Sequence, residues 1–278
     1  MILDHATEIR LSFFAGIFLL MVAYQALKPR RRNLFSAGLR EKSIRWSGNL
    51  GILFLNNIIV RLLFPMAMTG FAVLVQQRGW GLFNNLDLPF ELNVIFAVIL
   101  FDFAIYVQHI LFHVVPILWN FHRMHHSDTD FDVTTGTRFH PVEIIISVSI
   151  KLGVIILIGP PALAVLIFEI LLNATAMFNH SNIDLPVNID RVLRWFVVTP
   201  DMHRVHHSIV PKETNSNYGF NIPWWDRIFG TYIAQPNKGH LDMEIGLAIF
   251  RDPKYLQLHW LFVQPFINEK NSHIIDLE

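Results

Sequence analysis

The sequence has no cysteine and few charged residues. Without cysteine, disulfides, thiolate zinc sites, cysteine-ligated iron–sulfur clusters and cysteine nucleophiles are excluded. Charged residues make up 16% of the chain, against roughly 25% in soluble globular domains, and the mean hydropathy is +0.40. The 22 basic and 22 acidic residues give no net charge, so no nucleic acid partner is expected. The composition predicts a membrane protein.

Five long apolar runs occur, at residues 11–27, 50–75, 92–112, 144–158 and 162–178. A helix needs about 20 residues to cross the bilayer core, so the first, fourth and fifth runs are marginal in length. Pro65 predicts a kink in the second run, and Gly159-Pro160-Pro161 predicts a sharp turn between the last two. We expect an all-α integral membrane protein with four or five transmembrane or re-entrant helices, because the last two runs fit either a full hairpin or a re-entrant pair.

Basic residues follow the first apolar run. The leader MILDHATEIR lacks the basic region of a cleaved signal peptide, whereas lysine and arginine after a span favour the cytoplasmic side. If this basic segment is cytoplasmic, the number of membrane crossings between it and each clustered histidine is even, so all of these histidines lie on the cytoplasmic side. The result is the same whether the fourth and fifth runs form a full hairpin or a re-entrant pair. The segment contains Lys28, Arg30, Arg31, Arg32, Arg40, Lys42 and Arg45.

The chain becomes more polar from Asn182 onward, which predicts a cytoplasmic helical cap interrupted by prolines. We expect three parts: N-terminal membrane anchor helices over 1–90, a catalytic domain over 91–235 and a C-terminal cytoplasmic tail over 236–278. The chain ends in IIDLE, without an endoplasmic-reticulum retrieval signal, and this favours a bacterial inner membrane.

Histidine is abundant, with 14 residues, and most of them are spaced to share a helical face. His109 and His113 are four residues apart at the end of the third run. The stretches HRMHH at 122–126 and HRVHH at 203–207 each place histidines at i, i+3 and i+4. One more histidine follows the fifth run, so the clustered imidazoles are His109, His113, His122, His125, His126, His180, His203, His206 and His207.

A metal site explains these histidines better than simple burial does. Without a metal, each buried imidazole would need its own polar partner, and protonated rings would repel one another. One metal takes at most six ligands and a catalytic metal keeps a position open, so eight or nine imidazoles imply two metals. The isolated histidines are interpreted as structural residues: His5, His240, His259 and His273.

Zinc chemistry remains an alternative. A zinc peptidase would carry HExxH, with the glutamate as general base, but the intervening residues here are Arg123-Met124 and Arg204-Val205. A zinc transporter would hold its ligands near the middle of the spans, whereas these histidines follow the ends of apolar runs. A histidine-rich zinc-binding membrane hydrolase or transporter, and an inactive scaffold with a structural metal, therefore stay open.

The ordered motifs resemble the fatty acid hydroxylase and sterol desaturase superfamily of integral membrane di-iron oxygenases. The resemblance rests on HILFH, HRMHH, HHSDTDFDVTTGTRFHPVE, FNHSN, HRVHH and NYGFNIPWWDRIFGTY, and it extends from residue 95 to residue 232. It implies two iron ions held by the nine clustered histidines, with O2 as co-substrate. The implied function is oxidation of a lipid C–H bond, with hydroxylation preferred over desaturation.

The resemblance also bears on partners. Superfamily members with an attached cytochrome b5 domain carry HPGG, but His140-Pro141 is followed here by Val142, and no GxGxxG occurs to bind a dinucleotide. A separate electron donor of ferredoxin or cytochrome b5 type is therefore expected. The lipid substrate would come from the bilayer and the donor from the cytoplasm.

Further candidate site residues lie beside the second histidine motif. Proline and glutamate after His140 suit the first turn of a helix, whatever else they do. The resemblance implies that Arg138, His140 and Glu143 act next to the metal or the substrate, as candidate catalytic residues.

Ligating histidines usually donate their other ring N–H to an oxygen atom. Asp201, two residues before His203, is the first candidate acceptor. Family members can have a histidine pair where this chain has only His180, so Asn179, Asn182 or water would complete the ligand set. Membrane-interface anchoring is expected of Trp224, Trp225 and Phe229, and the other candidate acceptors are Asp128, Asp130, Asp132 and Asp184.

Overall fold

The structure, a computed structural model, describes residues 3–31 and 38–267, and every regular element within these ranges is a helix. Arg32, His273 and the end of the predicted tail, 268–278, lie outside the described residues. The expected all-α fold with a helical cap is confirmed.

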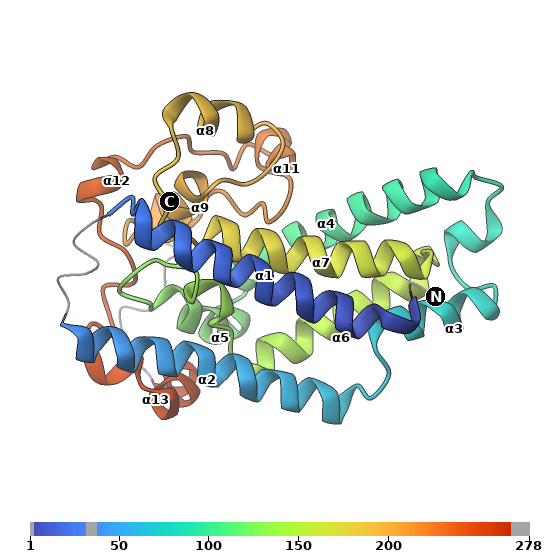
Figure 1. Cartoon of the computed structure of the whole chain (residues 1–278), viewed down its shortest axis with the longest axis horizontal. Helices are drawn as coiled ribbons and strands as arrows, with labels where there is room; N and C mark the ends of the chain where they lie inside the picture. Colours follow the sequence, from blue (N-terminus) through green and yellow to red (C-terminus); the bar gives the residue numbers. More distant parts are fainter. Residues whose placement is uncertain (1–2, 32–37, 268–278) are drawn as a thin grey trace.

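Five segments are long and apolar enough to span a membrane. Three of them are single helices, one joins the short η1 (Leu3–His5) to α1, and the other combines α2 with the two short helices that follow it. α6 and α7 have 18 residues each, so each is about 27 Å long, and in Figure 1 both run along the bundle in opposite directions. Their length favours a full hairpin over a re-entrant pair. The bundle helices are α1 (Ala6–Leu27), α2 (Leu39–Leu63), α4 (Phe90–Val114), α6 (Pro141–Ile158) and α7 (Ala162–Asn179).

Pro65 ends a helix instead of kinking one. α2 stops at Leu63, and α3 (Met68–Gln77) begins after a break, followed by η3 (Leu82–Asn85). Proline has no N–H to donate and its ring disfavours helical geometry in the preceding residue, so the chain leaves the helix before it. The predicted single run is therefore two helices.

Two glycines meet at the far end of the bundle, away from the histidines. Gly159 ends α6 with φ of +60°, a conformation that favours glycine. A Cβ on Gly81 would lie 2.2 Å from the Gly159 backbone nitrogen, so neither position has room for a side chain. This contact fixes the turn between α6 and α7 against the loop before η3.

The histidine-bearing ends of α4 and α7 lie at one end of the bundle. Figure 1 shows the end of α1, the start of α2 and most of the short helices at this end, with α3 and the N-terminus at the opposite end. The histidines are thus on the same side of the bundle as the basic segment, as the count of crossings predicts. The short helices form the cap: α5 (Pro116–His126), η4 (Thr135–Thr137), α8 (Val187–Leu193), α9 (Pro200–His206), α10 (Pro211–Thr214), α11 (Trp224–Ile228) and α12 (Gly239–Asp242).

The predicted tail folds back onto the cap as far as it is described. After α12, which belongs to the cap, its elements are η5 (Pro253–Leu256), α13 (Leu258–Val263) and η6 (Gln264–Phe266). The guanidinium of Arg123, on α5, donates to the carbonyl oxygens of Gln264 at 2.9 Å and Ile267 at 2.7 Å. Buried Leu261 packs with Ile52 of α2 and Met124 of α5. The tail thereby supports α5, which carries the first histidine triplet.

Candidate metal centre

All nine clustered histidines gather in two adjacent buried groups. Within each group, one potential ligand atom from every residue lies within 4.8 Å of those from the others. None of the nine residues is more than 6% exposed. The five-histidine group is His109, His113, His122, His126 and His206, and the four-histidine group is His125, His180, His203 and His207.

Each histidine triplet is divided between the two groups. In HRMHH, His122 and His126 join the five-histidine group and His125 joins the other. In HRVHH, the i and i+4 residues join the four-histidine group and the i+3 residue joins the other. His126 and His207, from different triplets and different groups, stack with their ring centroids 4.6 Å apart. The repeated motif therefore builds two neighbouring sites that share both helices.

Both triplets end a short helix that begins with proline. Pro116 starts α5 and Pro200 starts α9, where the missing N–H costs no helical hydrogen bond. The Thr199 side chain accepts a hydrogen bond from the Met202 backbone at the start of α9. Local sequence thus fixes where each triplet lies on its helix.

Backbone carbonyls set the orientation of several rings. Nδ1 of His109 lies 2.8 Å from the carbonyl oxygen of Tyr218, and Nδ1 of His206 lies 2.7 Å from that of Ser216. A carbonyl oxygen only accepts, so each Nδ1 carries the hydrogen and each neutral Nε2 presents a lone pair. The two Nε2 atoms are 3.0 Å apart and neither can donate to the other.

The same arrangement recurs in the four-histidine group. Nδ1 of His180 donates to the carbonyl oxygen of Ala176 at 2.7 Å, and its Nε2 lies 3.0 Å from Nε2 of His203. Nitrogen ligands bound to one metal at about 2.1 Å are separated by roughly 3.0 to 3.4 Å. A cation between the facing lone pairs of His109 and His206 removes their repulsion, and the ring nitrogens of both groups have the spacing of metal ligands, so both groups fit a metal ion.

Burial keeps these rings neutral. It is the main reason why the pKa of His206 falls to about 3 and that of His180 to about 4. Burial, followed by the charges of neighbouring imidazoles, also lowers the pKa of His125, His203 and His207 well below the ordinary value. Metal binding requires unprotonated imidazole, so the ligand form is already present at neutral pH.

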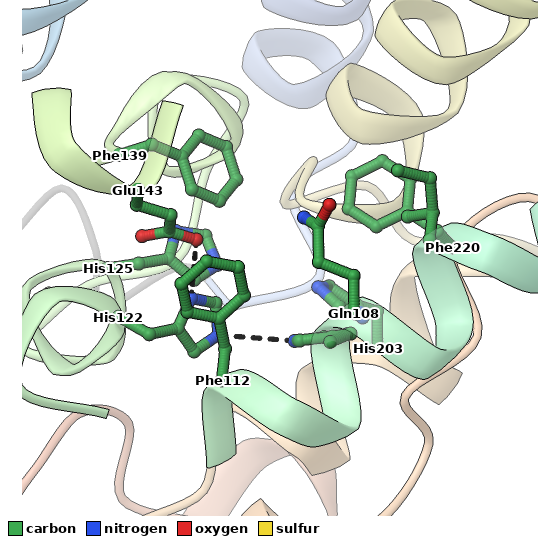
Figure 2. A pocket seen from close by; sticks show the side chains of 10 residues that line it. Gln108, Phe112, His122, His125, Phe139, Glu143, His203 and Phe220 are labelled. Carbon is green, nitrogen blue, oxygen red and sulfur yellow. Dashed lines mark hydrogen bonds and ion pairs between the residues drawn. The ribbon is translucent and has the colours of Figure 1, made fainter. Parts of the chain in front are cut away.

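A small, partly open cavity borders both histidine groups. Figure 2 shows Glu143 and His122 on one side of it and Gln108, His203 and Phe220 on the other. Much of its wall is apolar, and part of it comes from the membrane-spanning helices α4 and α6. The full lining is Ile105, Gln108, His109, Phe112, His122, His125, Phe139, Glu143, His203 and Phe220.

Of the three predicted catalytic residues, Glu143 is the one that lines the cavity. Its Oε1 lies 2.7 Å from Nδ1 of His122, while its buried Oε2 has no hydrogen-bond partner among the described residues. Arg138 is fully buried and donates from Nε to the carbonyl oxygen of Met124 at 2.8 Å, behind the histidines. His140 caps α6 and accepts a hydrogen bond from the Val142 backbone at 3.2 Å.

The buried N-cap His140 predicts an acid-sensitive helix start. Burial lowers its pKa to about 4, below the ordinary 6.5. Between these values the unfolded chain binds a proton that the folded chain does not, so stability falls as the pH falls through this window. A His140→Asn variant keeps a capping side chain without the titration. We expect it to lose less thermal stability than the original chain between pH 7 and pH 5; equal losses would contradict this role for His140.

Arg45, the last residue of the basic segment, supports the loop after the first histidine triplet. It is buried, and its guanidinium binds Asp128 at 2.6 and 2.9 Å, Asp132 at 2.7 Å and Thr135 at 2.8 Å. These carboxylates lie in the loop after the first histidine triplet, and Asn49 of α2 also binds Thr134 there. α2 therefore clamps the loop that leads from α5 to α6. Because Arg45 follows other basic residues, its sequence position did not reveal this role.

The aspartates expected to orient ligating histidines bind arginines instead. Asp201 forms ion pairs with Arg204 and Arg30, and Asp184 pairs with Arg30. Carbonyl oxygens and Glu143 occupy the positions next to the histidine rings. The Asn182 side chain bonds to the backbone of Arg31, so it is not available as the expected additional ligand.

Two buried aspartates that were not singled out from the sequence hold the loop before α11. Asp102, within α4, accepts hydrogen bonds from the backbone of Asn221 at 3.2 Å and from the Trp225 indole at 2.8 Å. Asp226 accepts from the backbones of Tyr218 and Gly219, both at 2.8 Å. This loop supplies the carbonyl that orients His109. An ionisable residue inside an apolar run, such as Asp102, was the available signal.

Comparison with known proteins agrees with this site. Residues 94–231, which contain all nine histidines, match the family model described as fatty acid hydroxylase. The chain therefore contains a fatty acid hydroxylase domain. The residues that orient the rings and line the cavity therefore lie within a fatty acid hydroxylase domain.

Three relatives illustrate the range of the family. An ornithine lipid hydroxylase, OlsE, of Rhizobium tropici is 30% identical over 158 residues, covering 56% of this chain and 46% of its own. The alkylglycerol monooxygenase of Xenopus tropicalis is 29% identical over 201 residues, or 69% of this chain and 44% of its own. A cholesterol 25-hydroxylase-like protein of Danio rerio is 26% identical over 255 residues, or 83% and 94%.

The chain spans less than half the length of the first two of these relatives. No solved structure matches it significantly.

Proposed function

We propose that the protein is a membrane-bound di-iron oxygenase that uses O2 to hydroxylate a C–H bond of a lipid. The observation that carries this proposal is the pair of buried histidine groups bordering a largely apolar cavity beside the spans. The names of the three relatives, all hydroxylases or monooxygenases, favour hydroxylation over desaturation.

Each group of residues has a separate task in this proposal. The nine clustered histidines hold two iron ions, which supply the capacity to activate O2. Glu143 accepts the Nδ1 hydrogen of His122, keeping the Nε2 lone pair directed into the five-histidine group. Its free Oε2 can accept a hydrogen bond from a polar substrate group or a water molecule in the cavity. Ile105, Phe112, Phe139 and Phe220 bind the acyl chain and exclude water.

Arg138 and His140 act as positioning residues. Arg138 ties the end of α5 to α2 by donating to the Asn49 side chain and to Ser127, and its carbonyl oxygen accepts from Nδ1 of His125 at 3.2 Å. His140 fixes the start of α6, one turn before Glu143. Both residues therefore place groups that face the cavity.

Electrons come from a separate donor of ferredoxin or cytochrome b5 type. Lys28 caps the C-terminal end of α1, and the backbones of Lys28 and Arg30 bond to those of Asp184 and Asn182, just after His180. Under the positive-inside rule, basic residues at this end of the bundle favour a cytoplasmic location, where a soluble donor could reach the site. A bacterial inner membrane is the proposed location.

Isotope labelling tests the reaction. The chain, purified with iron supplied, is incubated with a reductant, a ferredoxin and a total membrane lipid extract under 18O2, and the lipids are analysed by mass spectrometry. We expect one labelled oxygen atom in a lipid hydroxyl group. Unlabelled lipids together with bound zinc that iron never displaces would favour the hydrolase or transporter alternative.

Glu143→Gln tests the orienting carboxylate. The amide keeps the size of the side chain but loses the charge that strengthens the bond to His122. Loss of such a partner typically lowers metal affinity or activity about 10- to 100-fold, and we expect a decrease in this range for both. Iron retention against a chelator and turnover are the measurements. Glu91→Gln, at an exposed position at the far end of α4, is the control and should match the original chain.

A further inference from the structure

α8 and the turn after it reverse the usual distribution of polar and apolar side chains. Asp190 and Arg194 are buried and form an ion pair on the inner face. The outer face exposes Val192 at 59% and Phe196 at 67%. A helix in contact with water would bury its apolar face and expose its charges. The outer face of α8 therefore fits an apolar environment.

α11 continues this apolar surface. The Trp224 indole donates to the carbonyl oxygen of Trp195 at 2.6 Å, and the Arg227 guanidinium lies 4.0 Å from the centre of the Trp195 ring. Next to this contact, Ile228 is 65% exposed and Phe229 is 55% exposed. The joined surface, called the ledge below, consists of Val187, Ile189, Val192, Trp195, Phe196, Trp224, Ile228 and Phe229.

The ledge lies beside a membrane span instead of above it. Ring centroids of Trp225 and Phe103 are 4.8 Å apart, and those of Phe229 and Tyr106 are 5.7 Å apart. Phe103 is 11 residues before Val114, the last residue of α4, so α11 contacts the span about 16 Å from its end. In Figure 1, α8 and α11 flank the histidine end of the bundle.

We propose that the ledge is embedded in the leaflet of the bilayer at the histidine end. Contiguous exposed apolar patches of this kind mark contacts with a membrane or another protein. Continuity decides for the bilayer, because α4 itself exposes Leu100, Val107 and Leu111 to its surroundings, at 37%, 38% and 41%. Two of the eight ledge residues, Trp195 and Trp224, are tryptophans, which are enriched at membrane interfaces.

This contact concerns the membrane boundary of the cap and is independent of the proposed oxidation. It also relates the cavity to the proposed membrane contact. Phe220 lines the cavity and precedes Trp224, the first residue of α11, by four residues, so the embedded surface is close in sequence to the cavity wall.

The absence of native cysteine allows a direct test. Val192→Cys on α8 and Ile228→Cys on α11 are made singly in the full chain, labelled with a nitroxide and placed in nanodiscs of phosphatidylcholine and phosphatidylglycerol. Collision with O2, which partitions into lipid, is compared with collision with a water-soluble nickel chelate. Phe54→Cys, exposed on α2, is the lipid reference, and Lys212→Cys, exposed on α10, is the water reference.

We expect both ledge positions to collide several-fold more with O2 than with the nickel chelate, as the Phe54→Cys label does. A ratio like that of Lys212→Cys would show that the ledge faces water and would overturn the proposal. Low collision with both reagents would mean that a second copy or another protein covers the ledge, and this also overturns it.

Discussion

The His122→Ala, His206→Ala double variant is expected to lose about one of two bound iron ions and all measurable lipid oxidation. Both residues belong to the five-histidine group, and the remaining three ligands bind a metal far more weakly than five do. The four-histidine group keeps all its members. Metal analysis of detergent-purified protein and a turnover assay with 18O2 measure the two effects.

His259→Ala is the matched control for this variant. His259 is exposed on α13 and belongs to neither group, so iron content and turnover should stay at the original level. Full iron content in the double variant would contradict the assignment of the five-histidine group. Normal iron with no turnover, even in the original chain, would favour the inactive scaffold.

Arg45→Met is expected to destabilise the protein by about 3 to 5 kcal/mol, because it leaves Asp128 and Asp132 buried without their cation. Methionine preserves the apolar stem, so the lost ion pairs dominate the change. The clamped loop connects the first histidine triplet to Glu143, and iron retention should fall with stability. Thermal and denaturant unfolding in detergent measure the effect.

Arg40→Met, one to two turns earlier on α2, separates this effect from a general loss of positive charge. Arg40 is exposed, so its replacement should change stability by no more than about 0.5 kcal/mol. Equal stability of the two variants would show that the buried carboxylates do not depend on Arg45.

The membrane-spanning helices could be predicted because the signal is local. A span must satisfy its own backbone hydrogen bonds and present apolar side chains, so hydropathy and length reveal it without knowledge of its neighbours. The break at Pro65 shows the limit of this approach. Proline marks an interruption, but whether the chain kinks or starts a new helix depends on the packing of α3 against the rest of the bundle.

The contacts that support the site could not be predicted in the same way. Asp201 is close to His203 in sequence, yet it pairs with Arg204 and Arg30. The Glu143 carboxylate that orients His122 is 21 positions away from it, and the Tyr218 carbonyl that orients His109 is 109 positions away. Arg45 and Asp128 are 83 residues apart. Pairings over such distances leave no periodic pattern in the sequence.

An all-helical membrane protein with nine clustered imidazoles at one end of its bundle follows from the amino-acid sequence. Helical spacing and the parity of the crossings depend on local composition, and they point to metal binding. Which imidazoles form a group depends on the packing of distant segments, as with His109 and His206, whose Nε2 atoms approach to 3.0 Å across 97 residues of chain. The reason is physical: a metal site requires convergence of lone pairs within a few ångströms, and only the packing of α4, α5, α7 and α9 sets those distances.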